Sequence, residues 1–143
     1  MADTQKKDFD SLTGMAGCVT VCRELYVGSV GAKCYLMYLA SNVNNDSCTF
    51  YKSTLEASID TGLDEHTIRD LNEKWIKAGF LKVTEHPWWT KQANDYKLIL
   101  SVLRQFLKAQ LKEGVKDVAM QARKNKSNER TQRYRLKKKA KQA

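Results

Sequence analysis

Between Ser53 and Gly79 the sequence carries start and stop signals for two short helices joined by a tight turn. Ser53 and Glu56 have the spacing of a capping box, in which a hydroxyl and a carboxylate each satisfy a free backbone amide at the helix start. Gly62 supplies the positive φ that the turn needs. Asp64 is a favourable N-cap for the second helix, and Gly79 is a favourable stop. The segment therefore predicts a helix-turn-helix.

The second of these helices, Asp64–Ala78, is expected to be amphipathic. At about 100° per residue, Ile68, Leu71 and Trp75 share one stripe, which Leu63 extends at the turn. The opposite, exposed side is expected to carry His66, Arg69, Asp70, Glu73 and Lys77. In the first helix, Leu55 and Ile59 are four residues apart and are expected to face inward.

The residues that follow predict a β-hairpin. Phe80–Glu85 alternates between apolar and polar side chains, and Tyr96–Leu100 is expected to be its antiparallel partner. The connection 86–95 is longer than a minimal hairpin loop and contains Trp88, Trp89 and Lys91. Before the first helix, Ser47–Tyr51 is a further short strand candidate, with Cys48 and Phe50 on one side.

The N-terminal third shows one clear helix. Its apolar positions recur at spacings of three and four over Val30–Asn42, and Ser29 offers an N-cap. Cys18–Val21 is rich in β-branched residues and predicts a short edge strand, while Arg23–Val27 suits a single helical turn. Residues 1–16 are polar and expected to be flexible. The predicted fold is mostly α with a small antiparallel β-sheet: a domain over 17–101 and a C-terminal helix.

The C-terminal helix is expected over residues 102–122, where apolar residues keep helical spacing. Gly114 interrupts this run and costs about 1 kcal/mol relative to alanine in a helix interior, so a kink or break is expected there. The apolar face either packs back on the domain or forms a homodimer seam. Residues 123–143 hold ten basic residues and one acidic residue. Without an apolar face to bury, this tail is expected to be disordered when free.

The charge of the chain is unevenly divided. Residues 1–96 hold 10 Lys/Arg and 13 Asp/Glu, whereas residues 97–143 hold 15 Lys/Arg and 3 Asp/Glu. The formal net charge of +9 therefore comes from the C-terminal third. Such asymmetry is typical of chains with a polyanionic partner, usually nucleic acid.

Other features bear on compartment and chemistry. The four cysteines, Cys18, Cys22, Cys34 and Cys48, match no common zinc spacing, and Cys34 and Cys18 are expected on apolar faces as reduced, buried thiols. No run of about 18 apolar residues or signal peptide is found, so no membrane association and a cytoplasmic, nucleoid-associated location are expected. The phosphate-binding glycine pattern, the zinc-protease motif and the nucleophile elbow are absent from the sequence. We expect no enzyme activity, no metal and no cofactor.

One stretch resembles a known family. The residues AKCYLMYLASNVNNDSCTFYKSTLEASIDTGLDEHTIRDLNEKWIKAGFL resemble the winged-helix domains of phage and plasmid replication initiators and related mobile-element regulators. CVTVCRELYVG is similar to the strand and turn before helix one in lambdoid phage replication-origin proteins, and NDYKLIL to their final wing strand. NERTQRYRLKKKAK resembles a basic segment of phage DNA-associated proteins. The resemblance covers Val19–Leu100 and implies that the helix Asp64–Ala78 binds DNA.

These observations predict a DNA-binding protein of a phage, plasmid or other mobile element, acting in transcription regulation or replication initiation. Double-stranded DNA is the expected partner. The expected contacts are His66, Arg69, Lys74, Lys77, Lys82, Trp88, Trp89, Lys91, Arg123, Lys124, Lys126, Arg130, Arg133, Arg135, Lys137, Lys138, Lys139 and Lys141.

A second interpretation remains open because the same helix carries acids that repel phosphate, and because its bases can form i,i+4 ion pairs such as Glu65–Arg69, Asp70–Lys74 and Glu73–Lys77. In that interpretation the chain is a protein-interaction adaptor. An acidic winged helix binds a host or replication protein, and the tail gives non-specific nucleic-acid affinity.

Overall fold

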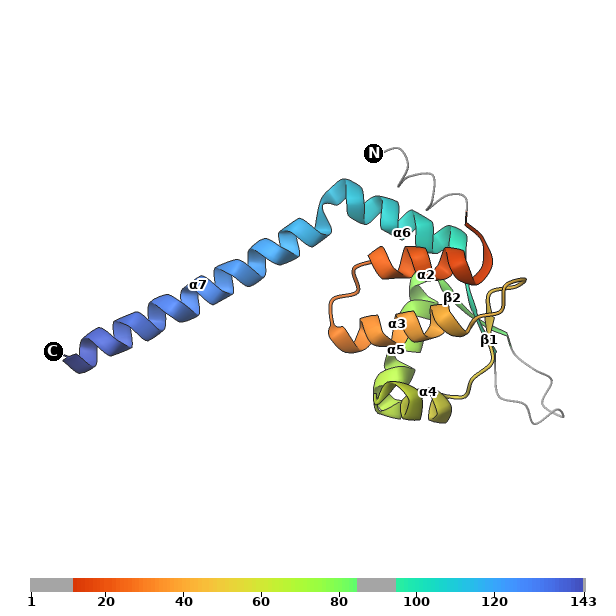
Figure 1. Cartoon of the computed structure of the whole chain (residues 1–143), viewed down its shortest axis with the longest axis horizontal. Helices are drawn as coiled ribbons and strands as arrows, with labels where there is room; N and C mark the ends of the chain where they lie inside the picture. Colours follow the sequence, from red (N-terminus) through yellow and green to blue (C-terminus); the bar gives the residue numbers. More distant parts are fainter. Residues whose placement is uncertain (1–11, 85–94, 143) are drawn as a thin grey trace. The chain divides into compact units, whose positions relative to one another are not determined.

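The chain is mostly helical with a small three-stranded antiparallel sheet, which confirms the predicted fold class (Figure 1). The computed structural model describes residues 12–84 and 95–142. In chain order the elements are α2 (Gly14–Glu24), α3 (Val30–Asn42), β1 (Thr49–Phe50), α4 (Thr54–Thr61), α5 (Glu65–Ala78), β2 (Leu81–Thr84), β3 (Asp95–Leu98), α6 (Leu100–Glu113) and α7 (Val115–Gln142).

The sheet has the strand order β1-β3-β2, so the strand that follows the hairpin loop lies in the middle. Leu81 is opposite Leu98 and Thr84 is opposite Asp95 in the β2–β3 pair, while Phe50 of β1 is opposite Tyr96. β1 and β2 lie within the ranges predicted for them, whereas β3 overlaps the predicted Tyr96–Leu100 but ends at Leu98, and Leu100 begins α6. The predicted loop contacts Trp88, Trp89 and Lys91 lie outside the described residues.

The structure corrects the prediction for the segment before α3. Cys18–Val21 lies in α2, not in a strand, and the turn predicted over Arg23–Val27 is absent because α2 ends at Glu24 and Leu25 is extended. The buried residues Gly17, Cys18, Val21 and Cys22 follow helical spacing. Packing of this face against the core overrides the β-propensity of the branched residues.

The C-terminal end of α2 is capped by the side chain of Lys33, which belongs to α3. The Lys33 ammonium donates hydrogen bonds to the carbonyl oxygens of Cys22 (2.6 Å), Arg23 (2.5 Å) and Leu25 (2.7 Å). The last carbonyls of a helix have no partner within the helix, and a cation also favours the negative end of the helix dipole. Lys33 therefore fixes the end of α2 against α3.

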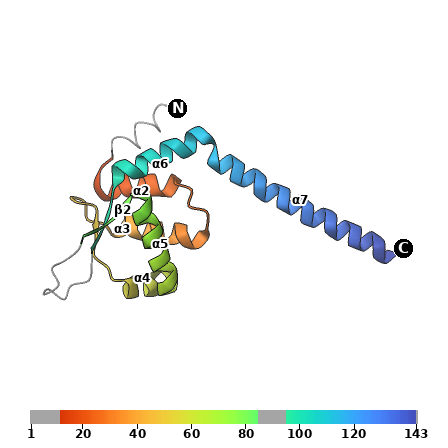
Figure 2. The same ribbon diagram turned by 180° about the vertical axis from the view of Figure 1, so that it is seen from behind.

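The core lies between α2, α3, α5, α6 and the sheet. Four aromatic rings connect α3, α5 and α6: the centroids are 5.5 Å apart for Tyr35 and Trp75, and 5.6 Å apart for Trp75 and Phe80 and for Phe80 and Phe106. The predicted stripe of α5 is confirmed, since Ile68 and Trp75 are buried. Figure 2 views this body from behind, with α4 and α5 toward the reader.

The capped turn is largely as predicted. The Ser53 hydroxyl accepts from the Glu56 amide at 3.1 Å, Gly62 has a φ of 77°, and Asp64 accepts from the Thr67 amide at 2.8 Å. The inward face predicted for α4 is wrong. Leu55 and Ile59 are 57% and 73% exposed, and Ala57 is the residue of α4 that is buried.

The C-terminal part also differs from prediction. The break at Gly114 is confirmed: its φ is +63°, which favours glycine, and it separates α6 from α7. Residues 123–142, expected to be disordered, belong to α7. The reason lies in composition, because Lys, Arg, Gln and Ala all have high helix propensity. The chain divides into two compact units, Met1–Lys108 and Ala109–Ala143.

Candidate nucleic-acid interface

The outward face of α5 carries the side chains that the sequence predicted there. His66, Arg69, Asp70, Glu73 and Lys77 are all exposed, as is Lys74. The opposite side of the helix is held in the core, so the charged row is fixed in direction. This arrangement gives α5 a polar surface of fixed direction.

Three side chains of α5 each have an acidic neighbour one helical turn away: His66, Arg69 and Lys77. Arg69 Nη2 lies 3.1 Å from Glu65 Oε2, and Lys77 Nζ lies 3.3 Å from Glu73 Oε1, so these two predicted pairs are confirmed. Asp70 contacts His66 Nε2 at 3.3 Å. The third predicted pair, Asp70–Lys74, is not among the ion pairs of the described residues.

The electrostatic consequence is a nearly neutral α5 surface, because three acids (Glu65, Asp70, Glu73) offset three bases (Arg69, Lys74, Lys77). Exposed pairs of this kind contribute about 0–1 kcal/mol and are screened by salt. The cations can therefore leave their carboxylates for a stronger anion at little cost. The acids remain beside them, however, and weaken any attraction to phosphate.

The sheet adds a positive position that the sequence prediction missed. Lys82 of β2 is exposed, and its direct neighbour across the antiparallel pair is Lys97 of β3. Like charges directly opposite each other destabilise a sheet, so an anion near both would relieve their repulsion. The sequence alone shows only that Lys97 belongs to a predicted strand. The register of the hairpin, which places Lys97 opposite Lys82, could not be predicted from it.

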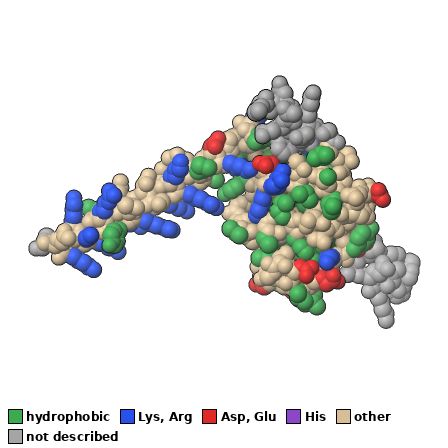
Figure 3. All heavy atoms as spheres, in the orientation of Figure 1, with side chains coloured by type: hydrophobic (Ala, Val, Ile, Leu, Met, Phe, Trp, Pro, Cys, Tyr) green, Lys and Arg blue, Asp and Glu red, His purple; other side chains and the backbone are tan. Residues whose placement is uncertain are grey.

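All the predicted tail residues that carry positive charge are exposed on α7 (Figure 3). They are Arg123, Lys124, Lys126, Arg130, Arg133, Arg135, Lys137, Lys138, Lys139 and Lys141. Their helical placement gives them fixed angular relations around one axis, which an unstructured tail would not have.

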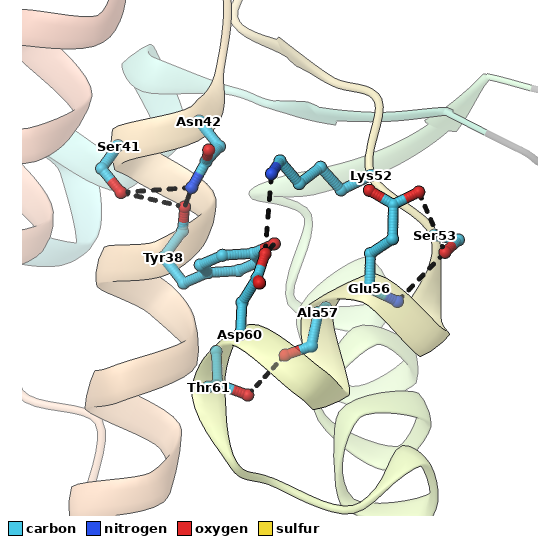
Figure 4. A network of polar contacts seen from close by, with 9 residues as sticks. All are labelled: Tyr38, Ser41, Asn42, Lys52, Ser53, Glu56, Ala57, Asp60 and Thr61. Carbon is cyan, nitrogen blue, oxygen red and sulfur yellow. Dashed lines mark hydrogen bonds and ion pairs between the residues drawn. The ribbon is translucent and has the colours of Figure 1, made fainter.

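A second surface lies on α4, where acidic side chains gather in Figure 3. There the Tyr38 hydroxyl donates to Asp60 Oδ2 at 2.6 Å, and Lys52 Nζ lies 3.5 Å from the same oxygen (Figure 4). The hydrogen bond from Tyr38 lowers the pKa of Asp60, with Lys52 adding to the effect. Burial and the contact with Asp60 raise the pKa of Tyr38. This network joins α3 to α4, and two apolar side chains of α4, Leu55 and Ile59, are exposed.

Cys18 and Cys34 were predicted as buried thiols; the prediction for Cys18 is confirmed, and the prediction for Cys34 is wrong. Cys34 is exposed, while Cys18 and Cys22 are buried. Position 34 falls on the outer side of α3, away from the buried Tyr35 and Leu36. Within the ranges that the structure describes, no group of three or more His, Cys, Asp or Glu residues could hold a metal ion.

In the same described ranges, no helix combines the length and the apolarity needed to cross a membrane. Comparisons with protein families, curated proteins and solved structures give no match to this chain.

Proposed function

We propose that the chain is a DNA-binding protein of a mobile element that acts in transcription regulation or replication initiation. The observation that carries the proposal is α5 itself: an exposed polar helix, fixed from behind by Ile68 and Trp75 and followed directly by a β-hairpin. The order of three helices and three strands from α3 to β3, with β3 central in the sheet, supports a winged helix-turn-helix.

In this proposal each surface has its own role. His66, Arg69, Lys74 and Lys77 face the major groove, where an arginine that contacts guanine bidentately discriminates by about 1–3 kcal/mol. Lys82 and Lys97 contact the backbone beside the hairpin. The cations of α7 supply affinity without sequence preference by releasing counterions from phosphate.

The α5 ion pairs give a direct test. Glu65→Gln with Glu73→Gln removes the two acids beside Arg69 and Lys77, so both cations become fully available to the major groove and to the phosphates that border it. The measured quantity is the slope of the logarithm of the binding constant against the logarithm of the salt concentration, for a duplex selected from a random pool. The magnitude of this slope should increase by about two, since each added phosphate contact contributes roughly 0.9. Charge reversal by Arg69→Glu with Lys77→Glu should abolish sequence preference and retain binding to random duplex.

The matched control is Asp46→Asn with Glu24→Gln, which makes the same change in net charge on other parts of the body. The control should leave the slope within about one unit of wild type. If both pairs of substitutions shift the slope equally, α5 is not at the interface. If no preferred sequence emerges from selection, the role of α5 as a sequence reader is rejected.

The exposed apolar pair on α4 favours a second candidate function, an adaptor that binds a host or replication protein. Leu55 and Ile59 are exposed, lie four residues apart on α4 and each precede an acid, Glu56 or Asp60. Leu55→Lys with Ile59→Lys should leave duplex binding unchanged under the DNA-binding proposal. Under the adaptor proposal, the same substitutions abolish the chain's activity in its host while the α5 substitutions do not.

A further inference from the structure

The positions of the cations around α7 carry an inference about how this helix binds. α7 spans 28 residues, and no side chain in it is buried. At 1.5 Å per residue its length is about 42 Å. It contains eleven Lys/Arg and two Asp/Glu. The angular distribution of these charges is set by the helix and can be read from their spacing.

Six of the cations follow one another at intervals of three or four residues. At about 100° per residue they occupy a sector of about 80° and extend over about 27 Å of the axis. We call this set the basic stripe: Arg123, Lys126, Arg130, Arg133, Lys137 and Lys141.

Four other cations, Lys124, Arg135, Lys138 and Lys139, lie on another side of the helix, about 150° away on average, and the eleventh, Lys116, precedes both groups by about two turns. We call them the off-stripe cations. Glu129 lies at the edge of the basic stripe, four residues before Arg133. Two groups of cations with the same chemistry and exposure, but different directions, thus share one helix.

The basic stripe repels itself. Lys126 and Arg130, Arg133 and Lys137, and Lys137 and Lys141 are like charges at i,i+4, a spacing that destabilises an isolated helix. An anion that lies along the stripe removes this repulsion. The axial interval between neighbouring cations is about 5 Å. This is comparable with the 3.4 Å rise per phosphate of one DNA strand, given the reach of Lys and Arg side chains.

We propose that α7 binds duplex DNA as a helix and through one face, with the basic stripe along a phosphate backbone. The inference rests on the proposed DNA-binding function and specifies which surface supplies its non-specific affinity. An unstructured polycation, by contrast, would use all of its charges alike. The helical and the unstructured modes of binding therefore differ in which cations contact DNA, although the total charge is the same.

Two full-length variants with equal net charge test the geometry. The first neutralises four members of the basic stripe: Lys126→Gln, Arg130→Gln, Arg133→Gln and Lys137→Gln. The second neutralises the four off-stripe cations: Lys124→Gln, Arg135→Gln, Lys138→Gln and Lys139→Gln. The measurement is the salt dependence of binding to a random-sequence duplex, by fluorescence anisotropy.

The stripe variant should lose about 3.6 from the magnitude of the slope, at roughly 0.9 per phosphate contact, while the off-stripe variant should lose less than about one. Equal losses would overturn the one-face proposal and leave DNA binding intact. If wild-type protein bound no duplex at all, the proposed function would fail instead. Stronger binding to single-stranded DNA of the same length would overturn the choice of a duplex.

A helix-breaking substitution gives an independent readout. Asn128→Pro keeps every charge but interrupts α7, because proline removes a hydrogen bond and clashes with the preceding turn. It should weaken duplex binding and reduce the helical circular dichroism signal, whereas Asn128→Ala should change neither. Unchanged affinity for Asn128→Pro would show that helical geometry does not matter.

Discussion

The Tyr35 hydroxyl donates a hydrogen bond to Asn72 Oδ1 at 2.5 Å, in the core between α3 and α5. Tyr35 is 1% exposed and Asn72 is 5% exposed, so neither group can exchange this partner for bulk water. The same tyrosine ring stacks on Trp75 at 5.5 Å. Together the two contacts fix the rotation of α5 about its own axis, and with it the direction of the charged row.

Loss of the hydroxyl should therefore be costly. Tyr35→Phe leaves the Asn72 amide buried without its partner, and an unsatisfied buried polar group costs about 1–3 kcal/mol. Urea denaturation should show a loss of unfolding free energy in that range. Tyr134→Phe is the control, because Tyr134 is exposed on α7, and it should change stability by less than about 0.5 kcal/mol. A loss for Tyr35→Phe as small as that of the control would contradict the assignment.

Substitutions at two isoleucines test whether the Leu55–Ile59 side of α4 is exposed, as the structure shows, or faces inward, as the sequence predicted. Ile68 is fully buried, and Ile68→Ala should cost about 2–5 kcal/mol through lost apolar contact and the cavity that remains. Ile59 is 73% exposed, so Ile59→Ala should stay within about 0.5 kcal/mol of wild type. The chemistry of the two substitutions is identical, and only burial differs. Equal losses in thermal denaturation would mean that α4 packs as the sequence first suggested.

The Tyr38–Asp60 contact predicts a pH dependence. The pKa of Asp60 is lowered in the folded state, mainly by the Tyr38 hydrogen bond. Its contribution to stability is present above the unfolded pKa of about 3.9 and is lost as pH falls through the folded value. Tyr38 has a raised pKa, so its contribution is present below pH about 10 and is lost at more alkaline pH.

Asp60→Asn removes the titrating group at the acidic end. Urea midpoints measured between neutral pH and acid should fall less steeply below pH about 4 for this variant than for wild type. Asp46→Asn, in the turn after α3, serves as the control, since Asp46 takes no part in this network. Identical acid profiles for wild type and Asp60→Asn would contradict the assigned shift.

The thiols should differ in reactivity. Cys34 is exposed, whereas burial raises the pKa of Cys18 and raises that of Cys22 to about 12. Because the thiolate is the reactive species, iodoacetamide at mildly alkaline pH should modify Cys34 first, as peptide mass spectrometry can follow. Cys34→Ser should remove the fast phase. A fast reaction of Cys18 in the folded protein would contradict its burial.

The sequence predicted those elements whose ends are set by local chemistry. Ser29, Asp64 and Gly79 are capping residues, and the bounds of α3 and α5 follow them. α2 was missed because Cys18–Val21 has strand propensity by itself and becomes helical only when one face packs on the core. In α4, two turns hold too few apolar positions to fix the inward direction, and the small Ala57 occupies it.

Those parts of the candidate site that depend on local sequence spacing were also predictable. The exposure of Arg69 and Lys77 follows from the apolar stripe behind them, and their ion pairs follow from i,i+4 spacing. Lys97 depends on strand register, which one sequence does not specify. The basic stripe depends on helix formation in a segment whose composition equally suits disorder.

The division of the chain at residue 108 has a consequence for its colloidal behaviour. Met1–Lys108 contains thirteen Lys/Arg and thirteen Asp/Glu, so the formal charge of +9 belongs entirely to Ala109–Ala143. Molecules with a net charge near zero associate and precipitate readily, so repulsion between copies of the chain is expected to come from the second unit. A polyanion that neutralises that unit also removes the repulsion, and loading many copies onto one nucleic acid should condense them together.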